Sequence, residues 1–506
     1  MRHGDLLLAS ILVAGLLHPV QARAGSFEYE VQGTNTVARS GANVAHVEDP
    51  SALYLNVAGI GKLDQIQILL DTNITKLVTG VKLEGNRVNE WSVAGVEHEY
   101  MYVENGDKPF MGPLIAGSFG VPGAPGLVLG LGVFGPAAVG DYSFRVQRHV
   151  DEGVLVPGPQ RYDLVMERVL FYWPTIALAY RITPRLVVGM GFQWGYLDFR
   201  YAIVGNMSPV RTNTTYQGDF LAEVHAIDWF VPAYLFGITW RPLDWLETGF
   251  SLRVSDAIDA RAKKLVITVN AWSDDPIRSD DKTIEWMDTD PNFDRPHGSV
   301  QFKWPPLKLR YGIRFAMPRT DLVPADVKAT VPAHLKEWFD VELAFFFETS
   351  GVVENMDIQV KGQVPIGRDA GQATVLRPEQ DGKFSIQRGW EHCWSLRLGG
   401  DVNLWKGRIT MSAGGFYDRG AAPPAYSRLD YMAFDRWGLS GGFVFRVWKL
   451  DLKFSYIHMF YPVREVKEGK IQHLQGTGDA SLATTINSGT YRTAIDVWAM
   501  GVALRI

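Results

Sequence analysis

Seven aspartates lie close together in residues 272–295, and part of this stretch has the spacing of a metal-binding loop. Oxygen ligands at alternate positions would open such a loop, as in the calcium-binding hand. They would come from Asp288, Asp290, Asn292 and Asp294. The match then ends, because the sixth position is Phe293 instead of glycine and the twelfth is Ser299 instead of glutamate. We therefore predict a solvated acidic loop and no bound metal, with weak divalent-ion binding as the alternative.

Candidate catalytic groups do not form a recognisable set. His225, His392 and His458 each stand alone in an alternating pattern, with no nucleophile motif beside them. The single Cys393 excludes an internal disulfide and a cysteine-rich metal site. The glycine pairs at 130 and 132 and at 189 and 191 lack the strand-to-helix context of a phosphate loop, so they mark close approaches of another backbone or an inserted segment. The sequence predicts neither an enzyme nor a cofactor.

Composition and the N-terminus restrict the class of protein. The chain has 506 residues and a net charge of -5, which argues against a nucleic-acid partner. A basic start, an apolar run from Leu6 to Leu17 and the small-residue site Ala22-Arg23-Ala24 predict a removable export signal over residues 1–24. No later apolar run reaches the ~18 residues that a membrane helix needs. The exported chain is therefore either soluble or a closed β-barrel.

Alternating hydrophobicity favours the barrel. In 390–404 the even positions are mostly apolar and the odd positions mostly polar. Residues 448–461 alternate in the same way, and in 338–360 the odd positions are the apolar ones. We count fourteen such runs, an even number, with short turns alternating with long polar connections. An apolar row ending at Ile506 is typical of the last strand of an outer-membrane barrel. The prediction is an all-β, transmembrane antiparallel barrel of about fourteen strands over residues 65–506.

Residues 25–64 have no periodicity that would form a wall strand, and we predict that they form a plug inside the barrel. The stretch Asp49-Pro50-Ser51-Ala52-Leu53-Tyr54-Leu55-Asn56 resembles the N-terminal plug of the FadL-type outer-membrane transporters of fatty acids and hydrocarbons. That family usually continues Asn-Pro-Ala-Gly, whereas this chain has Asn56-Val57-Ala58-Gly59, without the proline. The plug residues indicated by the resemblance are Asp49, Pro50, Asn56, Ala58 and Gly59.

The third predicted strand contains an interruption. Residues 127–134 alternate cleanly, and Gly135, Pro136 and the residues up to Gly140 then break the pattern before it resumes at Asp141. Proline cannot donate to a sheet ladder, so Pro136 predicts a local gap in the wall. In the resembled family, a kink of this strand makes a lateral opening through which apolar ligands leave. A bulge at the barrel rim without a transport role is the alternative.

Together these patterns predict a passive outer-membrane transporter of hydrophobic small molecules in a Gram-negative bacterium. Loop aromatics would capture the ligand, and the candidates are Trp272, Trp286 and Phe293. The expected partners are the hydrophobic ligand, outer-membrane lipid and lipopolysaccharide, and a monomer is expected. A polar-solute porin and a structural or adhesive surface barrel are the alternative functions.

Overall fold

A computed structural model describes residues 28–506 of the chain, apart from several internal stretches. The signal segment predicted at 1–24 therefore lies outside the described residues. The internal stretches left out are 47–48, 64–65, 85–101, 107, 136–140, 145–148, 152–153, 157, 207–218, 270–282, 288–296, 320–332, 362–363, 370–371, 377–382, 473 and 476–484.

Fourteen antiparallel wall segments close into a barrel, as the alternation predicted. Where a wall segment is interrupted, its two parts carry separate labels. The segments are β1 (Gln67–Leu83), β3 (Phe110–Gly120), β4 (Leu127–Phe134) with β5 (Asp141–Ser143), β8 (Met166–Thr183), β9 (Leu186–Asn206), β10 (Asp219–Leu243), β11 (Leu246–Ser255) with β12 (Ile258–Val269), β14 (His297–Phe302) with β15 (Leu307–Pro318), β16 (Glu337–Glu348) with β17 (Asn355–Lys361), β20 (Lys383–Gln387) with β21 (Cys393–Leu404), β22 (Ile409–Asp418), β23 (Arg436–Val447), β24 (Leu450–Phe460) and β27 (Gly489–Arg505).

Shorter elements belong to the connections between these wall segments. The short strands are β2 (Val103–Glu104), β6 (His149–Asp151), β7 (Val154–Val156), β13 (Thr283–Met287), β18 (Val364–Asp369), β19 (Gln372–Leu376), β25 (Arg464–Val466) and β26 (Leu474–Gln475). The short helices are η2 (Pro159–Tyr162), α5 (Ala333–Lys336), η5 (Ser350–Val352), η6 (Trp405–Gly407) and η7 (Pro424–Tyr426).

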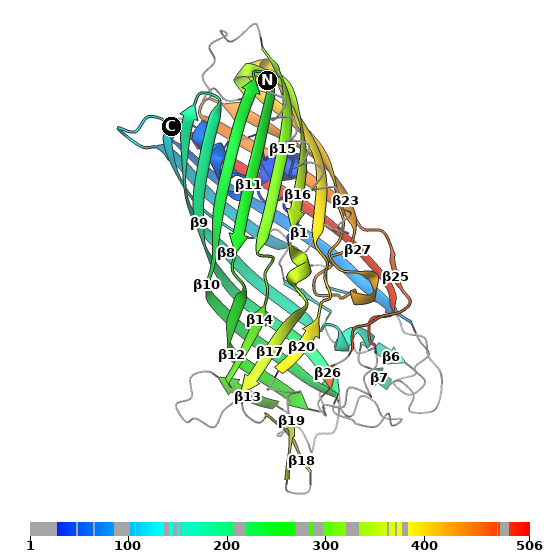
Figure 1. Cartoon of the computed structure of the whole chain (residues 1–506). Helices are drawn as coiled ribbons and strands as arrows, with labels where there is room; N and C mark the ends of the chain where they lie inside the picture. The colour runs from blue at the N-terminus through cyan, green and yellow to red at the C-terminus, as the bar shows by residue number, and fades with distance from the viewer. Residues whose placement is uncertain are drawn as a thin grey trace, which may run out of the picture.

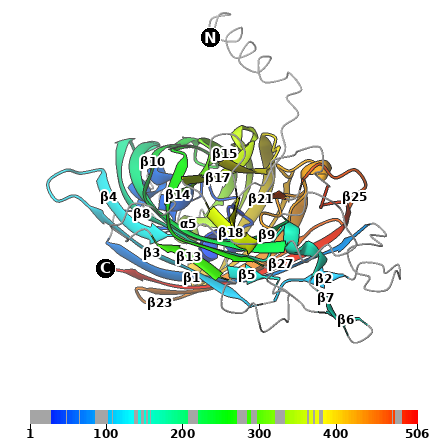
Figure 2. The same cartoon turned by 90° about the horizontal axis from the view of Figure 1, so that it is seen from below.

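The first and last wall strands close the barrel. β1 pairs with β27 along its whole length, from Gln67 opposite Arg505 to Leu83 opposite Gly489. β1 also pairs with β3, so it has a partner on each edge. The short turns between β8 and β9, β10 and β11, and β23 and β24 lie at the same end as the C-terminus, and most long connections start and end at the other end (Figures 1 and 2). The long connection between β15 and β16 is an exception, because Ala316 is hydrogen-bonded to Trp245 beside the β10–β11 turn.

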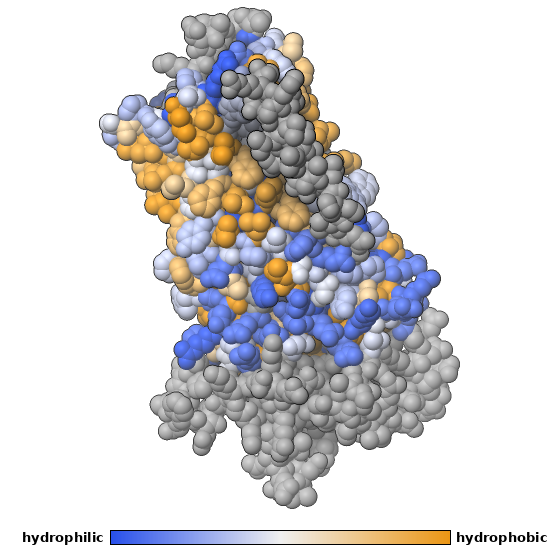
Figure 3. Space-filling model, in the orientation of Figure 1, coloured by the Kyte–Doolittle hydropathy of each residue, from blue (hydrophilic) through white to orange (hydrophobic). Residues whose placement is uncertain are grey.

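The two faces of the wall differ in polarity because strand side chains alternate between them. On β16, Val341, Leu343 and Phe345 are exposed on the outside, whereas Asp340 and Glu342 are buried on the inside. Apolar surface gathers on the half of the barrel that carries the short turns, and a polar band follows toward the long connections (Figure 3). This distribution is that of a wall whose apolar band lies in a membrane. Among the described residues, no helix is long and apolar enough to cross a membrane.

Residues 28–63, here called the plug, lie inside the barrel. They include α2 (Thr34–Ala38), α3 (Ala52–Leu55) and η1 (Val57–Lys62). α2 packs against β1, β22, β23, β24 and β27, while η1 packs against β4, β8, β9 and β10, so the plug touches the wall on opposite sides. Every described plug residue is buried except the half-buried Asn35 and Lys62. The wall strands therefore surround the plug (Figure 1).

Candidate functional site

Asn56 fastens the plug turn that the sequence singled out. Its side-chain nitrogen donates to the carbonyl oxygens of Val44, at 2.8 Å, and Ile238 on β10, at 3.1 Å. Its side-chain oxygen accepts from the backbone N–H of Ala58 at 3.1 Å. The backbone N–H of Gly59 donates to the Asn56 carbonyl at 2.9 Å, which closes the first turn of η1. The Asn56 side chain thus caps η1 without the proline that the resembled family has next.

Asp49 anchors the other side of the plug to the barrel wall. Its carboxylate forms a buried ion pair with Lys453 on β24, and it accepts from the side chain of Asn35 at 2.7 Å and from the N–H of Ser51 at 2.8 Å. Pro50 precedes α3, and its carbonyl accepts from the N–H of Leu53. Burial raises the pKa of Asp49, but the Lys453 ammonium and the Ser51 hydrogen bonds outweigh burial and hold this pKa below its usual range.

Glycines in the wall make room for the plug. A β-carbon at Gly189 would lie 2.7 Å from the backbone nitrogen of Ala58, and one at Gly130 would lie 2.7 Å from the Ile60 side chain. One at Gly237 would overlap the side-chain oxygen of Asn56. The prediction that Gly130 and Gly189 mark a close approach is confirmed. Gly191 differs, since its nearest neighbours belong to the adjacent wall strands.

A group of charges joins the plug to β16 and β21. Arg39 contacts Asp340 at 2.8 Å and Asp401 at 3.0 Å. Glu342 accepts from three successive plug N–H groups, those of residues 44, 45 and 46, at 2.7, 3.0 and 2.9 Å. The ring nitrogens of His46 lie 3.5 Å from Asp340 and 3.2 Å from Asp401. The charged residues of β16 and β21 therefore face inward and bind the plug instead of lining open water.

His46, Asp340 and Asp401 bring three metal-ligating groups together, with ligand atoms within 4.8 Å of one another. The same carboxylates already neutralise arginines. Arg39 bridges both aspartates, and Arg314 lies 2.8 Å from Asp340. Two fixed positive charges on these carboxylates disfavour a further cation. We assign this cluster to the plug–wall joint.

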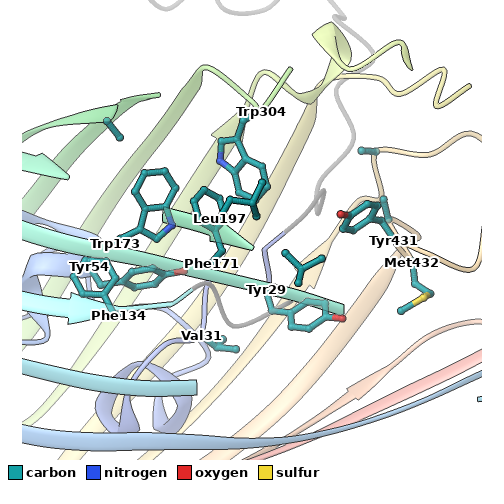
Figure 4. Packing of buried hydrophobic residues seen from close by; sticks show 14 of the residues in the cluster. Tyr29, Val31, Tyr54, Phe134, Phe171, Trp173, Leu197, Trp304, Tyr431 and Met432 are labelled. Carbon is teal, nitrogen blue, oxygen red and sulfur yellow. The ribbon is translucent and has the colours of Figure 1, made fainter. Parts of the chain in front are cut away.

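Buried aromatic rings form the apolar part of the lumen beside the plug (Figure 4). We call Tyr54, Phe134, Phe171, Trp173 and Trp304 the aromatic cluster. The ring centroids of Phe171 and Trp173 are 4.4 Å apart, those of Phe171 and Trp304 are 5.1 Å apart, and those of Tyr54 and Phe134 are 5.4 Å apart. The cluster thus joins the plug, through Tyr54, to wall strands β4 and β8.

Arg253 on β11 places a cation against this cluster. Its guanidinium carbon lies 4.1 Å from the centroid of the Trp173 ring, and the indole passes close to Gly195, where a β-carbon would lie 2.7 Å from the ring. Arg253 is only 3% exposed. One of its nitrogens lies 3.4 Å from Glu28, while Nε and Nη2, like the Trp173 ring nitrogen, make no hydrogen bond to the described residues. Two donor atoms of Arg253 and one of Trp173 are therefore buried without a hydrogen-bond partner among the described residues.

The wall is irregular beside the aromatic cluster. Phe134, the last residue of β4, pairs with Trp173 of β8, and the next pair along β8 joins Arg168 to Asp141 of β5. Between these two pairs the chain from β4 to β5 has six residues, 135–140. The partner strand β8 has only four residues there, 169–172. A β-carbon at Gly135 would lie 2.9 Å from the Phe171 carbonyl oxygen. The register of the wall thus changes between Phe134 and Asp141, where the sequence predicted an interruption. Pro136 and Gly140 lie outside the described residues, so the gap assigned to them stays a prediction.

The connection between β22 and β23 returns into the barrel, which the sequence analysis missed. Leu429, Tyr431, Met432 and Phe434 are buried, and Tyr431 and Met432 lie across the lumen from the aromatic cluster (Figure 4). Arg388 and Arg428 pair with Asp430 and Asp163 at 2.5 and 3.0 Å and fix this connection to the wall and to residues 159–165. The only signal in the sequence was the apolar run Tyr431-Met432-Ala433-Phe434 within a presumed loop.

Most of the predicted capture and metal residues are not described. Trp272 and Phe293 lie outside the described residues, as do Asp288, Asp290, Asn292 and Asp294. For Trp286 only the backbone is placed, in β13, where it pairs with Leu265 of β12. The three histidines lie in or beside the wall. His225 contacts Asp198 and His458 contacts Asp496, and His392 accepts from the N–H of Gly351.

A closed barrel of fourteen wall segments, filled at one end by its own N-terminal residues, defines a plugged transmembrane barrel. Solved structures with this architecture cover 95% of the chain. A FadL homologue from Pseudomonas aeruginosa matches with a TM-score of 0.64 at 13% identity over 99% of its own length. The toluene transporter TodX of Pseudomonas putida matches with a TM-score of 0.60 at 12% sequence identity over 99% of its length. The toluene transporter TbuX of Ralstonia pickettii matches with a TM-score of 0.53 at 13% sequence identity over its full length.

The chain therefore has the FadL-type fold, which confirms the predicted resemblance in architecture. No protein-family model and no curated protein sequence matches the chain. The comparisons thus establish the fold, and the function has to be argued from the site.

Proposed function

We propose that this protein is a passive transporter of hydrophobic small molecules in the outer membrane of a Gram-negative bacterium, and that its ligand leaves sideways through the wall. The observation that carries the proposal is the position of the wall irregularity. Phe134 and Trp173 form the last regular pair before residues 135–140, and both rings belong to the aromatic cluster. The apolar surface of the lumen therefore lies directly beside the place where the register of the wall changes.

Arg253 favours a ligand that carries an acceptor. Unmatched buried donors cost free energy, and a carboxylate would accept from Arg253 and the Trp173 ring nitrogen while its apolar body lies on the aromatic cluster. A fatty or aromatic carboxylic acid fits these groups better than a hydrocarbon does. The neighbours named as toluene transporters support the apolar half of this specificity.

The structure favours this function over a polar-solute porin. A porin needs an aqueous path along the barrel axis. Here the plug packs against β1, β4, β8 and β22 and forms buried ion pairs with β16 and β24, so it occupies the axis. A lateral route does not require the plug to leave.

The direct test is to restore the register of the wall. Replacing residues 135–140 with the four residues Val-Thr-Val-Thr would match the four residues of β8 between Arg168 and Trp173 and allow a continuous ladder. We expect the variant to fold with unchanged or higher resistance to heat, while uptake of a labelled fatty acid into vesicles containing the protein is lost. The matched control replaces 135–140 with Gly-Ser-Ala-Ala-Ser-Gly, which keeps the six-residue length and should transport normally. Normal uptake by the four-residue variant would refute lateral exit.

A further inference from the structure

The connection between β22 and β23, residues 419–435, forms a second internal segment, which we call the strap. Its apolar side chains Leu429, Met432 and Phe434 are at most 5% exposed. They belong to the same buried apolar cluster as Trp173, and Met432 lies across the lumen from Trp173 (Figure 4). The aromatic cluster is therefore covered by two segments of the chain, the plug and the strap.

The strap lies between the aromatic cluster and the end of the barrel that carries most long connections. Its Asp430 accepts a hydrogen bond from the Tyr201 hydroxyl of β9 at 3.1 Å. Trp173 of the aromatic cluster packs against Gly195 of the same strand. Because β9 begins at a short turn and runs away from it, Tyr201 is farther from the short turns than Gly195. A ligand that enters along the lumen from the long connections therefore passes the strap before it reaches Trp173.

Side chains hold the inner part of the strap in place. Among the described residues, 428–434 form no backbone–backbone hydrogen bond with a wall strand. Arg428 contacts Asp163 at 3.0 Å, and Asp430 contacts Arg388 at 2.5 Å. A sheet ladder would have to be unpaired along its length, whereas these few contacts can open locally. The strap can therefore leave the wall while the sheet stays intact.

The charges of the strap are balanced within the strap itself. Residues 419–435 contain two arginines and two aspartates, and Arg428 lies 3.5 Å from Asp430. The two partners outside the strap, Arg388 and Asp163, also carry opposite charges that attract each other. Opening would therefore separate two neutral groups, and no buried charge would lose all compensation.

The plug differs from the strap in this respect. Arg39 pairs with Asp340 and Asp401, and Asp49 pairs with Lys453, so each ion pair joins a plug charge to a wall charge. Removal of the plug would break these pairs and leave single charges on both sides. Of the two internal segments, the strap can thus move at the lower electrostatic cost.

We propose that the strap is a gate that opens toward the long connections, admits the hydrophobic ligand to the aromatic cluster and closes behind it. The gate concerns entry, whereas residues 135–140 concern exit. It rests on the proposed function only for the nature of the ligand. In the closed state Met432, whose flexible thioether chain adapts to irregular apolar shapes, would cover the bound ligand.

The first experiment ties the strap shut. The Lys470 N–H donates to the Ala425 carbonyl of the strap at 2.8 Å, so the two backbones are close enough for a disulfide. The tied variant carries Ala425→Cys and Lys470→Cys together with Cys393→Ser. We expect oxidation to slow the association of a fluorescent fatty acid with the folded protein in detergent at least about tenfold, because opening must precede binding. Reduction should restore the rate. A control disulfide from Asp357→Cys and Ser385→Cys, which pair on β17 and β20, should leave the rate unchanged.

The second experiment frees the strap and needs no ligand. Arg428→Gln with Asp430→Asn removes the ion pairs of the strap but keeps polar side chains of similar size. The reporter is Leu197→Cys on β9, again with Cys393→Ser, because Leu197 is only 1% exposed. We expect a water-soluble maleimide to label the reporter at least about tenfold faster in the freed variant, since charge-assisted contacts are lost.

The matched control for the freed variant is Arg185→Gln with Asp244→Asn, which removes an exposed ion pair at a short turn and should not change labelling. Equal association rates in the oxidised and reduced tied variant would overturn the gate, as would unchanged labelling of Leu197→Cys in the freed variant. Association that follows the state of the strap without uptake into vesicles would support the gate and refute lateral exit. If the freed variant does not show the heat-modifiable band of a folded barrel, the tied variant decides alone.

Discussion

The side chain of Asn56 occupies the space that a side chain at position 237 of β10 would need. This fit lets Asn56 reach the carbonyls of Val44 and Ile238 at once. Gly237→Val should therefore displace Asn56 and leave buried polar groups without partners, at roughly 1–3 kcal/mol. The expected result is a higher ion conductance in planar bilayers, because the plug no longer seals against β10. Gly441→Val, where the nearest neighbouring atom lies 3.6 Å from the added carbon, is the control and should conduct like the native protein.

Leu398 tests the placement of the apolar band. It lies on the outside of β21 and is 53% exposed, whereas the adjacent Arg397 is buried inside. Leu398→Arg should lower the free energy of unfolding by about 2–4 kcal/mol if the side chain faces the middle of the bilayer. Urea denaturation in phospholipid vesicles measures the change, with Leu398→Met as the control that keeps the volume. Equal stability of the two variants would mean that this surface does not face lipid.

The ion pair of Asp49 with Lys453 predicts an acid-sensitive plug. Because the pKa of Asp49 in the folded protein lies below its unfolded value, the pair contributes stability at higher pH, and this contribution is lost as the pH falls through the lowered pKa. The window therefore lies below pH ~4. Leakage of a small polar solute from vesicles should rise in this window in the native protein. Vesicles with the Asp49→Asn variant should leak already at pH 7. Their leakage should rise less on acidification than that of vesicles with the native protein.

Arg253 provides a test of ligand class. Arg253→Met removes the cation and the unmatched donors beside Trp173 but keeps an apolar side chain of similar length. Charge-assisted hydrogen bonds contribute about 1.5–3 kcal/mol, so binding of a long-chain carboxylate should weaken roughly 10-fold to 150-fold. Binding of the corresponding alcohol should change much less. Equal loss for both would show that Arg253 only supports Trp173. Loss for neither would remove the carboxylate from the proposal and leave hydrocarbon transport.

Much of the wall was predictable because one physical rule sets it. Alternation placed Leu343 outside and Glu342 inside, and all fourteen wall segments overlap the runs counted in the sequence. The interruption after Phe134 was visible as well, since glycine and proline there end an otherwise regular strand. Asn56 was found through a motif that the plug geometry explains.

The interior was less predictable because it depends on contacts between distant residues. The alternation by itself indicates a polar inner face, and in a water-filled lumen arginine at Ser395 would cost little. Ser395 is instead buried and hydrogen-bonded to Asp418, beside Arg397, and added volume there should be costly. Arg253 and Trp173 are separated by eighty residues in sequence, and no local pattern indicates that a cation lies over that indole.

The charge pairs between plug and wall also bear on how the molecule is made. Arg39 pairs with Asp340 and Asp401, and Asp49 pairs with Lys453. If the barrel closed without the plug, or the plug were buried without these wall residues, a buried charge would have no partner, which costs roughly 3–5 kcal/mol of stability. The plug comes first in the chain, and the β1–β27 seam needs the last strand. We expect the strands to close around a plug already in place, so that the N-terminal segment serves as an internal template during assembly. A chain lacking residues 28–63 should then insert slowly, and co-refolding with the separate segment should restore the rate.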